Sequence, residues 1–153
     1  MFAPALRRRT ARRCVFIPAY DFIIWARRDI HVVANSLISI IDDDESLRSA
    51  LVGLVRSLGY RARGFANAEE FLAADQANVS AAIVTDIQMP GLSGIELKER
   101  LVADGCVAPV IMITARSEPG LQERAFASGA LCVLKKPFAA EALIACLERA
   151  LAG

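Results

Sequence analysis

Residues 37–45 read Leu-Ile-Ser-Ile-Ile-Asp-Asp-Asp-Glu, an apolar run followed at once by four acidic residues. The run Leu37–Ile41 is rich in isoleucine and shows no alternation of apolar and charged residues. A short apolar run of this kind is typical of a strand that is buried on both faces of a parallel sheet. The acids that follow, beginning with Asp42, then lie at the carboxyl end of that strand.

Strands and helices alternate through the residues that follow. Apolar residues recur at helical spacing between positions 47 and 58, which predicts an amphipathic helix that ends at Gly59. Ser93 is followed three residues later by Glu96, a spacing typical of a helix N-terminus. We expect further strands at residues 60–65, 81–85, 110–113 and 131–134, and further helices at residues 67–74, 93–103, 119–128 and 139–151.

These strand–helix units predict the fold class. Five of them fit in about 115 residues, and each parallel strand needs a helical crossover to reach the next. We therefore predict an α/β fold of three layers, a doubly wound (βα)5 arrangement of the flavodoxin-like type with a parallel five-stranded sheet between helices. In such sheets, ligands bind beyond the carboxyl ends of the strands, near the point where the strand order reverses.

The size and composition of the chain favour one compact soluble domain. Its 153 residues exclude a receptor, a transporter or a multidomain enzyme. Hydrophobic residues make up 55% of the chain and charged residues 23%, a balance that supports a buried core and argues against disorder.

Residues 1–35 differ in composition from the rest of the chain. They carry a net charge of +5 from seven arginines and two aspartates, whereas the remainder carries −4. We expect residues 1–35 to be a basic N-terminal extension, poorly ordered or translated from a start codon assigned too early, and residues 36–153 to be the working domain. Pro18 and Asp21 interrupt the apolar run, which disfavours a signal peptide or a membrane span. A basic arm that touches membrane or nucleic acid is the remaining alternative.

The cysteines indicate neither a metal site nor a redox dithiol. Cys14, Cys106, Cys132 and Cys146 lie far apart in the sequence, and His31 is the only histidine. We expect the cysteines to act as small buried hydrophobes in a reducing, cytoplasmic compartment.

Polar residues follow four of the predicted strands. Asp42 and Asp43 follow the first, Asp86 follows the third, Thr114 follows the fourth and Lys136 lies just beyond the fifth. Because the carboxyl ends of parallel strands meet at one edge, these side chains should converge there. Their convergence is the strongest functional signal in the sequence.

Such a group of side chains suits phosphoryl chemistry. Clustered carboxylates repel one another, and a bound Mg²⁺, which prefers oxygen ligands, would relieve the repulsion. A lysine and a hydroxyl opposite them would suit a phosphoryl group. A carboxylate can itself be the nucleophile that accepts phosphate, and it needs no histidine base because it is already ionised at neutral pH.

Four stretches resemble the receiver domain of two-component response regulators. They are residues 40–45 (IIDDDE), 84–91 (VTDIQMPG), 111–115 (IMITA) and 135–138 (KKPF). Each motif alone is weak, but four in this order at successive strand ends are highly specific. The resemblance covers about residues 37–151, which is nearly all of the chain beyond the extension.

The resemblance implies a phosphate acceptor and a metal site. Asp86 matches the aspartate that accepts the phosphoryl group. Asp42 and Asp43 match the acidic pair that handles Mg²⁺, with Asp43 a direct ligand and Asp42 acting through water. Asp86 itself and the backbone carbonyl of Gln88 would complete the metal ligands.

The resemblance also implies a hydroxyl and a lysine that respond to the phosphoryl group. Thr114 matches the switch hydroxyl, and Lys136 matches the lysine that binds the phosphoryl group, often before a cis proline as Pro137 would be. Lys135 is the competing candidate, but it should point to the other side of the strand. Val133 departs from the family, which often has Tyr or Phe there, so gating by an aromatic ring is in doubt.

The implied function is that of a stand-alone phospho-receiver rather than an enzyme. A sensor histidine kinase or a histidine phosphotransfer protein would pass phosphate to Asp86 with Mg²⁺. Output would pass through the surface of residues 119–128, 131–134 and 139–151 to a downstream protein target, from a monomer or a phosphorylation-dependent dimer. The predicted domain fills the chain to Gly153, so we expect no direct DNA binding.

Two alternatives remain open at this point. A phosphatase of the haloacid-dehalogenase type also uses a phosphorylated aspartate, but it expects an acid where this chain has Gln88. A receiver-like module that signals without phosphate is the other, and the intact set of Asp42, Asp43, Asp86, Thr114 and Lys136 disfavours it.

Overall fold

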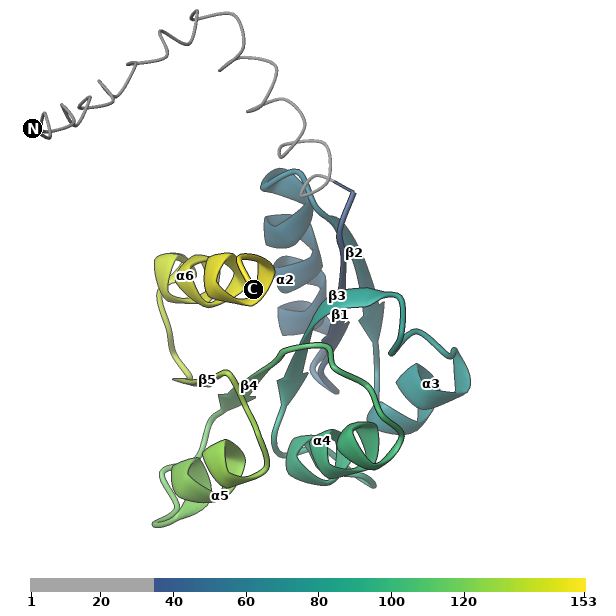
Figure 1. The fold of residues 1–153 in the computed structure, drawn as a ribbon. Coiled ribbons are helices and arrows are strands. Elements are labelled where there is room, and N and C mark those ends of the chain that lie inside the picture. Colours follow the sequence, from purple (N-terminus) through teal and green to yellow (C-terminus); the bar gives the residue numbers. More distant parts are fainter. Residues whose placement is uncertain (1–34) are drawn as a thin grey trace, which may run out of the picture.

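The computed structural model describes residues 35–153. The predictions for residues 1–34, and for Cys14 and His31 within them, lie outside the described residues. One parallel sheet forms the centre of the described part, with the strand order β2-β1-β3-β4-β5 (Figure 1). Its strands are β1 (Leu37–Ile41), β2 (Arg61–Phe65), β3 (Ser80–Asp86), β4 (Val110–Thr114) and β5 (Cys132–Lys135).

Helices cover both faces of the sheet (Figure 1). They are α2 (Glu45–Ser57), α3 (Ala68–Ala73), α4 (Gly94–Ala103), α5 (Leu121–Ala127) and α6 (Ala140–Leu151). Helices α2 and α6 pack on one face, and α3, α4 and α5 pack on the other. The predicted doubly wound, three-layer arrangement is therefore confirmed, with the strand order of the flavodoxin-like type. No helix within residues 35–153 is long and apolar enough to cross a membrane.

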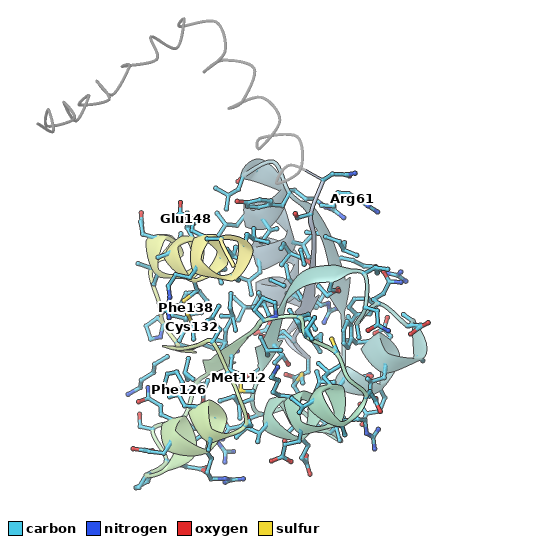
Figure 2. All side chains as sticks on the ribbon, in the orientation of Figure 1. Arg61, Met112, Phe126, Cys132, Phe138 and Glu148 are labelled. Carbon is cyan, nitrogen blue, oxygen red and sulfur yellow. The ribbon has the colours of Figure 1, made fainter. Side chains whose placement is uncertain are left out.

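Two apolar layers hold the sheet between its helices. The layer under α3, α4 and α5 includes a perpendicular contact between Phe65 and Phe71, with ring centroids 5.3 Å apart. Met112 of β4, labelled in Figure 2, is fully buried in the same layer. The layer under α2 and α6 contains Val55 and Leu143. Because every residue of β4 is buried, the centre of the sheet is shielded on both faces.

The helix starts agree with the sequence where a side-chain cap is present. Ser93 accepts a hydrogen bond from the Glu96 N–H, and the Glu96 carboxylate accepts one from the Ser93 N–H, so the predicted capping box is confirmed. The helix predicted from residue 119 instead begins at Leu121. Gly120 lies in the left-handed region (φ +79°) and caps α5 without a side-chain hydrogen bond, so the turn before it is not helical.

Helix α4 begins in close contact with the end of β3. The Gly94 N–H donates a hydrogen bond to the carbonyl oxygen of Ile87 (2.9 Å). A Cβ added at Gly94 would collide with the carbonyl oxygen of Asp86 and would lie 3.0 Å from the Ile87 Cα. Only glycine at this position lets the helix pack against the backbone that carries Asp86.

We predict that Gly94→Ala lowers the free energy of unfolding by about 1–3 kcal/mol, because the backbone of residues 86–87 has to move. The matched control is Gly53→Ala, where an added Cβ meets nothing within 4 Å. That helical substitution should raise stability by roughly 0.4–1 kcal/mol. Urea unfolding of both variants checks the prediction, and equal stability of Gly94→Ala and the native chain would contradict it.

Candidate functional site

The carboxylates predicted to converge lie at one edge of the sheet. Strands β1 and β3 are neighbours, with Ile41 paired to Thr85, so Asp42 and Asp86 emerge side by side. Asp42, Asp43 and Asp86 each offer one carboxylate oxygen, and these oxygens lie within 4.8 Å of one another. Asp42 is 1% exposed and Asp86 7% exposed, whereas Asp43 faces solvent. The cluster lies where the strand order reverses, as expected for a ligand site in this fold.

Lys136 reaches this cluster from the far edge of the sheet. Its Nζ lies 3.2 Å from Asp42 Oδ2 and 3.4 Å from Asp86 Oδ2. Its backbone N–H donates to the carbonyl oxygen of Thr114 (2.8 Å), and the peptide bond to Pro137 is cis. Lys135 is exposed and lines a different cleft at the start of α5. The structure therefore brings Lys136, and not Lys135, into contact with the carboxylates, and its role as the phosphoryl-binding lysine stays a prediction.

The local backbone holds Asp42 in place. Its N–H donates to the Phe65 carbonyl oxygen (3.1 Å), and its own carbonyl oxygen accepts from Arg48 (2.6 Å). Asp42 Oδ1 accepts a hydrogen bond from the Asp44 N–H (2.9 Å). The Asp44 side chain accepts a hydrogen bond from the Leu47 N–H (3.1 Å), so Asp44 is the N-cap of α2. The role of Arg48 was not predicted, because nothing local in the sequence shows that its side chain reaches back to β1.

The charges of the cluster perturb one another. Burial raises the pKa of Asp86 above its ordinary value, and the Asp42 carboxylate adds to the rise while the Lys136 ammonium opposes it. For Lys136, burial lowers the pKa, but the two carboxylates outweigh it and the net pKa is raised. Lys136 is therefore fully charged at neutral pH.

Thr114 lies at the carboxyl end of β4, but its hydroxyl points into the following loop. The Thr114 Oγ1 accepts a hydrogen bond from the Arg116 N–H (3.1 Å) and donates one to the Arg116 carbonyl oxygen (3.4 Å). Among residues 35–153 no hydrogen bond joins this hydroxyl to Asp86 or Lys136. The structure thus places Thr114 beside the cluster with its hydroxyl held by Arg116.

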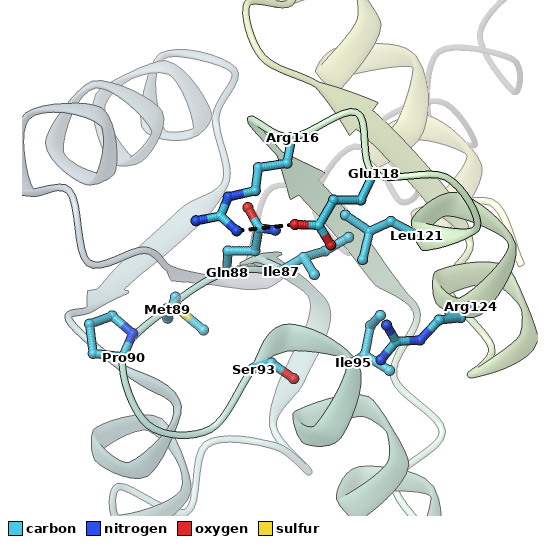
Figure 3. A pocket seen from close by; sticks show the side chains of 10 residues that line it. All are labelled: Ile87, Gln88, Met89, Pro90, Ser93, Ile95, Arg116, Glu118, Leu121 and Arg124. Atoms are coloured by element: carbon cyan, nitrogen blue, oxygen red, sulfur yellow. Dashed lines mark hydrogen bonds and ion pairs between the residues drawn. The ribbon is translucent and has the colours of Figure 1, made fainter.

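A cleft of about 440 Å³ opens between the loop after β3 and the start of α5 (Figure 3). Arg116 and Gln88 both line this cleft, and the Arg116 guanidinium forms an ion pair with Glu118 (3.0 Å), drawn as a dashed line in Figure 3. The Gln88 N–H lies 3.4 Å from Asp86 Oδ1, which brings this loop against the carboxylate cluster. The assignment of the Gln88 carbonyl as a metal ligand stays a prediction. Arg116 was not singled out from the sequence, although its spacing from Thr114 allowed the contact.

The donor set fits a divalent cation such as Mg²⁺. Asp42, Asp43 and Asp86 provide three carboxylates, and Lys136 balances one of their charges. Hard oxygen ligands with excess negative charge suit Mg²⁺, which commonly keeps several waters. Asp43 is the exposed member, so an ion entering from solvent would meet it first.

We predict that Asp86→Asn raises the melting temperature at pH 7 in the presence of EDTA. The pKa of Asp86 in the folded state is raised above its ordinary value of 3.8, so the protonated carboxyl favours the folded state. This stabilising contribution is complete below pH 3.8 and is lost as the pH rises through the folded-state pKa. The neutral amide avoids this loss, so the advantage of the variant should shrink toward pH 4.

Asp104→Asn, at an exposed carboxylate at the end of α4, is the matched control. It should leave the melting temperature nearly unchanged across the same pH range. A native chain more stable than Asp86→Asn at pH 7 would contradict the prediction.

Comparisons with known proteins show which family the chain belongs to. A family model described as "Response regulator receiver domain" matches residues 38–148. Transcriptional regulatory protein FixJ of Bradyrhizobium diazoefficiens is 36% identical over 114 residues, which cover 74% of this chain and 56% of FixJ. Nodulation protein W of the same organism is 31% identical over 131 residues, covering 82% of this chain and 58% of that protein. The chain spans little more than half the length of these two relatives.

Solved structures agree with this assignment. The chemotaxis protein CheY4 of Vibrio cholerae superposes with a TM-score of 0.70 at 28% identity, covering 76% of this chain and 99% of CheY4. The structure named FixJ-N superposes with a TM-score of 0.71 at 31% identity, covering 77% of this chain and 94% of that one. With the fold, the motifs and the family match in agreement, the chain belongs to the response regulator receiver domain family.

Proposed function

We propose that this receiver domain accepts a phosphoryl group on Asp86 from a phosphohistidine, with Mg²⁺ held by Asp42, Asp43, Asp86 and the backbone carbonyl of Gln88. The observation that supports it most is the contact of one ammonium, that of Lys136, with two buried carboxylates at the carboxyl edge of the sheet. A lysine that only balanced negative charge could form its ion pairs at the surface. Lys136 instead lies where its ammonium can contact both Asp86 and a phosphoryl group that arrives there.

The transfer forms one bond and breaks one bond. A carboxylate oxygen of Asp86 attacks phosphorus while the bond between phosphorus and the donor's imidazole nitrogen breaks, and the imidazole keeps the electron pair and takes a proton from water. Bound Mg²⁺ would neutralise charge on the phosphoryl oxygens. Asp86 needs no base, because it reacts in its ionised form.

Lys136 and Thr114 have different tasks in this proposal. Lys136 begins in contact with the Asp86 carboxylate and donates to a phosphoryl oxygen once the acyl phosphate has formed. To do the same, the Thr114 hydroxyl has to leave Arg116, since both of its hydrogen bonds go to that residue's backbone. Phosphorylation would then release the segment before α5 and shift the population of states on the surface of α5, β5 and α6.

The donor in this proposal is a sensor histidine kinase or a histidine phosphotransfer protein, and a downstream protein reads the phosphorylated surface in the cytoplasm, by a monomer or a phosphorylation-dependent dimer. The domain signals and is not a classical enzyme. Gln88 replaces the acid that a haloacid-dehalogenase-type phosphatase would place two residues after the nucleophile, which argues against that alternative. A phosphate-independent module is the alternative that the next experiment excludes or supports.

We predict that the full chain, incubated with Mg²⁺ and acetyl phosphate, gains the mass of one phosphoryl group. Asp86→Asn should gain none, because the nucleophile is absent, and omission of Mg²⁺ should abolish the gain. Asp75→Asn, at a carboxylate outside the cluster, serves as the control and should be modified like the native chain. Intact-mass spectrometry measures all four samples. Lack of an adduct on the native chain, or an adduct that persists in Asp86→Asn, would contradict the proposal.

A further inference from the structure

The edge of the sheet opposite the carboxylate cluster, where the strands begin, exposes apolar side chains. Each large apolar side chain that is exposed in residues 35–153 lies between the last turn of a helix and the start of the next strand; these are Leu58, Val79, Val102, Val107 and Phe126. Because parallel strands are joined by helices that run back over the sheet, all of these segments lie at the edge where strands begin. None of the five lies at the edge that holds Asp86.

Val107 shows that this exposure is built into the fold. Its side chain is 96% exposed, whereas its neighbours Cys106 and Ala108 are buried. The Cys106 N–H donates a hydrogen bond to the Leu101 carbonyl oxygen (2.9 Å), which fixes the turn after α4. Val107 therefore cannot turn into the core without displacing both of its neighbours, and it faces outward before β4.

The basic extension joins the domain at this same edge. Asn35 and Ser36 directly precede β1, and the Arg61 N–H donates a hydrogen bond to the Ser36 carbonyl oxygen (3.0 Å). A cleft of about 730 Å³ lies there, and Arg61 and the exposed Val79 are among the residues that line it. Figure 2 labels Arg61 at the start of β2, where its side chain is exposed. The chain therefore enters the domain beside exposed apolar and cationic side chains.

The exposed charges of the described edge balance one another. Arg56 in the last turn of α2 and Arg61 at the start of β2 are exposed, but so are Asp75 before β3 and Asp104 after α4. A positively charged surface at this edge therefore depends on the extension, which carries a net charge of +5 in residues 1–35.

The sequence of the extension combines arginines with an apolar run. Five arginines precede the run of residues 14–26 and two follow it. Trp25, the only tryptophan of the chain, lies two residues before the second group of arginines, and three further aromatic residues lie within the run. Arginines beside apolar and aromatic side chains are typical of segments that bind at the interface of an anionic membrane. An arm that binds single-stranded nucleic acid would instead mix its aromatic side chains with the arginines, for base stacking and phosphate contacts.

We propose that residues 1–35 and the edge where the strands begin together bind the surface of an anionic lipid bilayer. The arginines contact the phosphate groups of the lipids, and the apolar run enters the boundary between headgroups and acyl chains. Because Pro18 and Asp21 interrupt the run, it binds at the interface and does not cross the bilayer. The exposed apolar side chains of the edge, Val107 among them, then face the lipid.

This orientation leaves the carboxylate cluster accessible. Strand β1 has five residues, which places Asp42 roughly 17 Å from the edge where the bilayer lies. Membrane charge is screened over a Debye length of about 8 Å at physiological salt, so it acts weakly at Asp86. The protein bound to vesicles should therefore accept phosphate as fast as the free protein, an expectation that rests on the proposed function.

The test uses the fluorescence of Trp25 in the full chain. With vesicles of equal parts phosphatidylcholine and phosphatidylglycerol, the emission should shift to shorter wavelength and the protein should sediment with the vesicles. Vesicles of phosphatidylcholine alone should bind roughly tenfold or more weakly, because they carry no net charge to attract the arginines. High salt should likewise weaken binding to the anionic vesicles.

Variants separate the part of the extension from that of the edge. Arg27→Gln combined with Arg28→Gln should weaken binding by about tenfold, because two cations are lost. Val107→Asp should also weaken it, because a negative charge then faces the bilayer. The matched control is Gln122→Asp, which adds the same charge at an exposed position in the first turn of α5, at the opposite edge, and should bind like the native chain. Unchanged melting temperatures show that both aspartate variants fold.

Four outcomes would contradict the proposal or one of its parts. No sedimentation of the native chain with anionic vesicles, or equal sedimentation with phosphatidylcholine alone, would overturn it. Binding of DNA without binding of vesicles would assign the extension to nucleic acid. Equal binding by Val107→Asp and the native chain would overturn the part of the edge. Slower phosphate uptake on vesicles would overturn the orientation, whereas no uptake by the free protein would overturn the proposed function and leave the lipid result intact.

Discussion

The contact of the Lys136 ammonium with Asp42 and Asp86 is the interaction on which the rest of the site depends. Two buried carboxylates at the ends of neighbouring strands repel each other, and Lys136 is the cation that contacts both. To provide it, the chain has to place β5 beyond β4 and carry Lys136 across the end of that strand. The hydrogen bond from the Lys136 N–H to the Thr114 carbonyl oxygen secures this crossing.

The same cluster carries more negative than positive charge. Three carboxylates gather beside one ammonium, so the cluster has an excess of negative charge that a bound divalent cation would balance. A phosphoryl group on Asp86 would then meet Lys136 at once, whereas Thr114 would first have to release Arg116. Lys136 would therefore contact the phosphoryl group before Thr114 does, because Lys136 already contacts Asp86 whereas the Thr114 hydroxyl is bonded to Arg116. The segment before α5, which carries Arg116, is the part that would have to move.

Much of the fold and the candidate site follows from local sequence patterns. Within residues 35–153, apolar runs mark the buried strands β1, β3 and β4. The alternation with helices makes the sheet parallel, which brings Asp42, Asp86 and Lys136 to one edge. The contacts that long side chains make across the fold do not follow from such patterns. The contact of the Arg48 side chain with the Asp42 carbonyl oxygen depends on how helix α2 packs, and packing is decided by the whole core. The late start of α5 has a local cause in Gly120.

Calorimetric titration of the full chain with Mg²⁺, without any phosphate donor, shows whether the Lys136 ammonium competes with a cation for the carboxylates. If the Lys136 ammonium shares the carboxylates with the cation site, Lys136→Met should bind Mg²⁺ roughly tenfold more tightly, equivalent to about 1.4 kcal/mol. Asp43→Asn should bind it more weakly, and Lys135→Met should bind it like the native chain. Unchanged or weaker binding of Mg²⁺ by Lys136→Met would show that the Lys136 ammonium does not compete with the cation for Asp42 and Asp86.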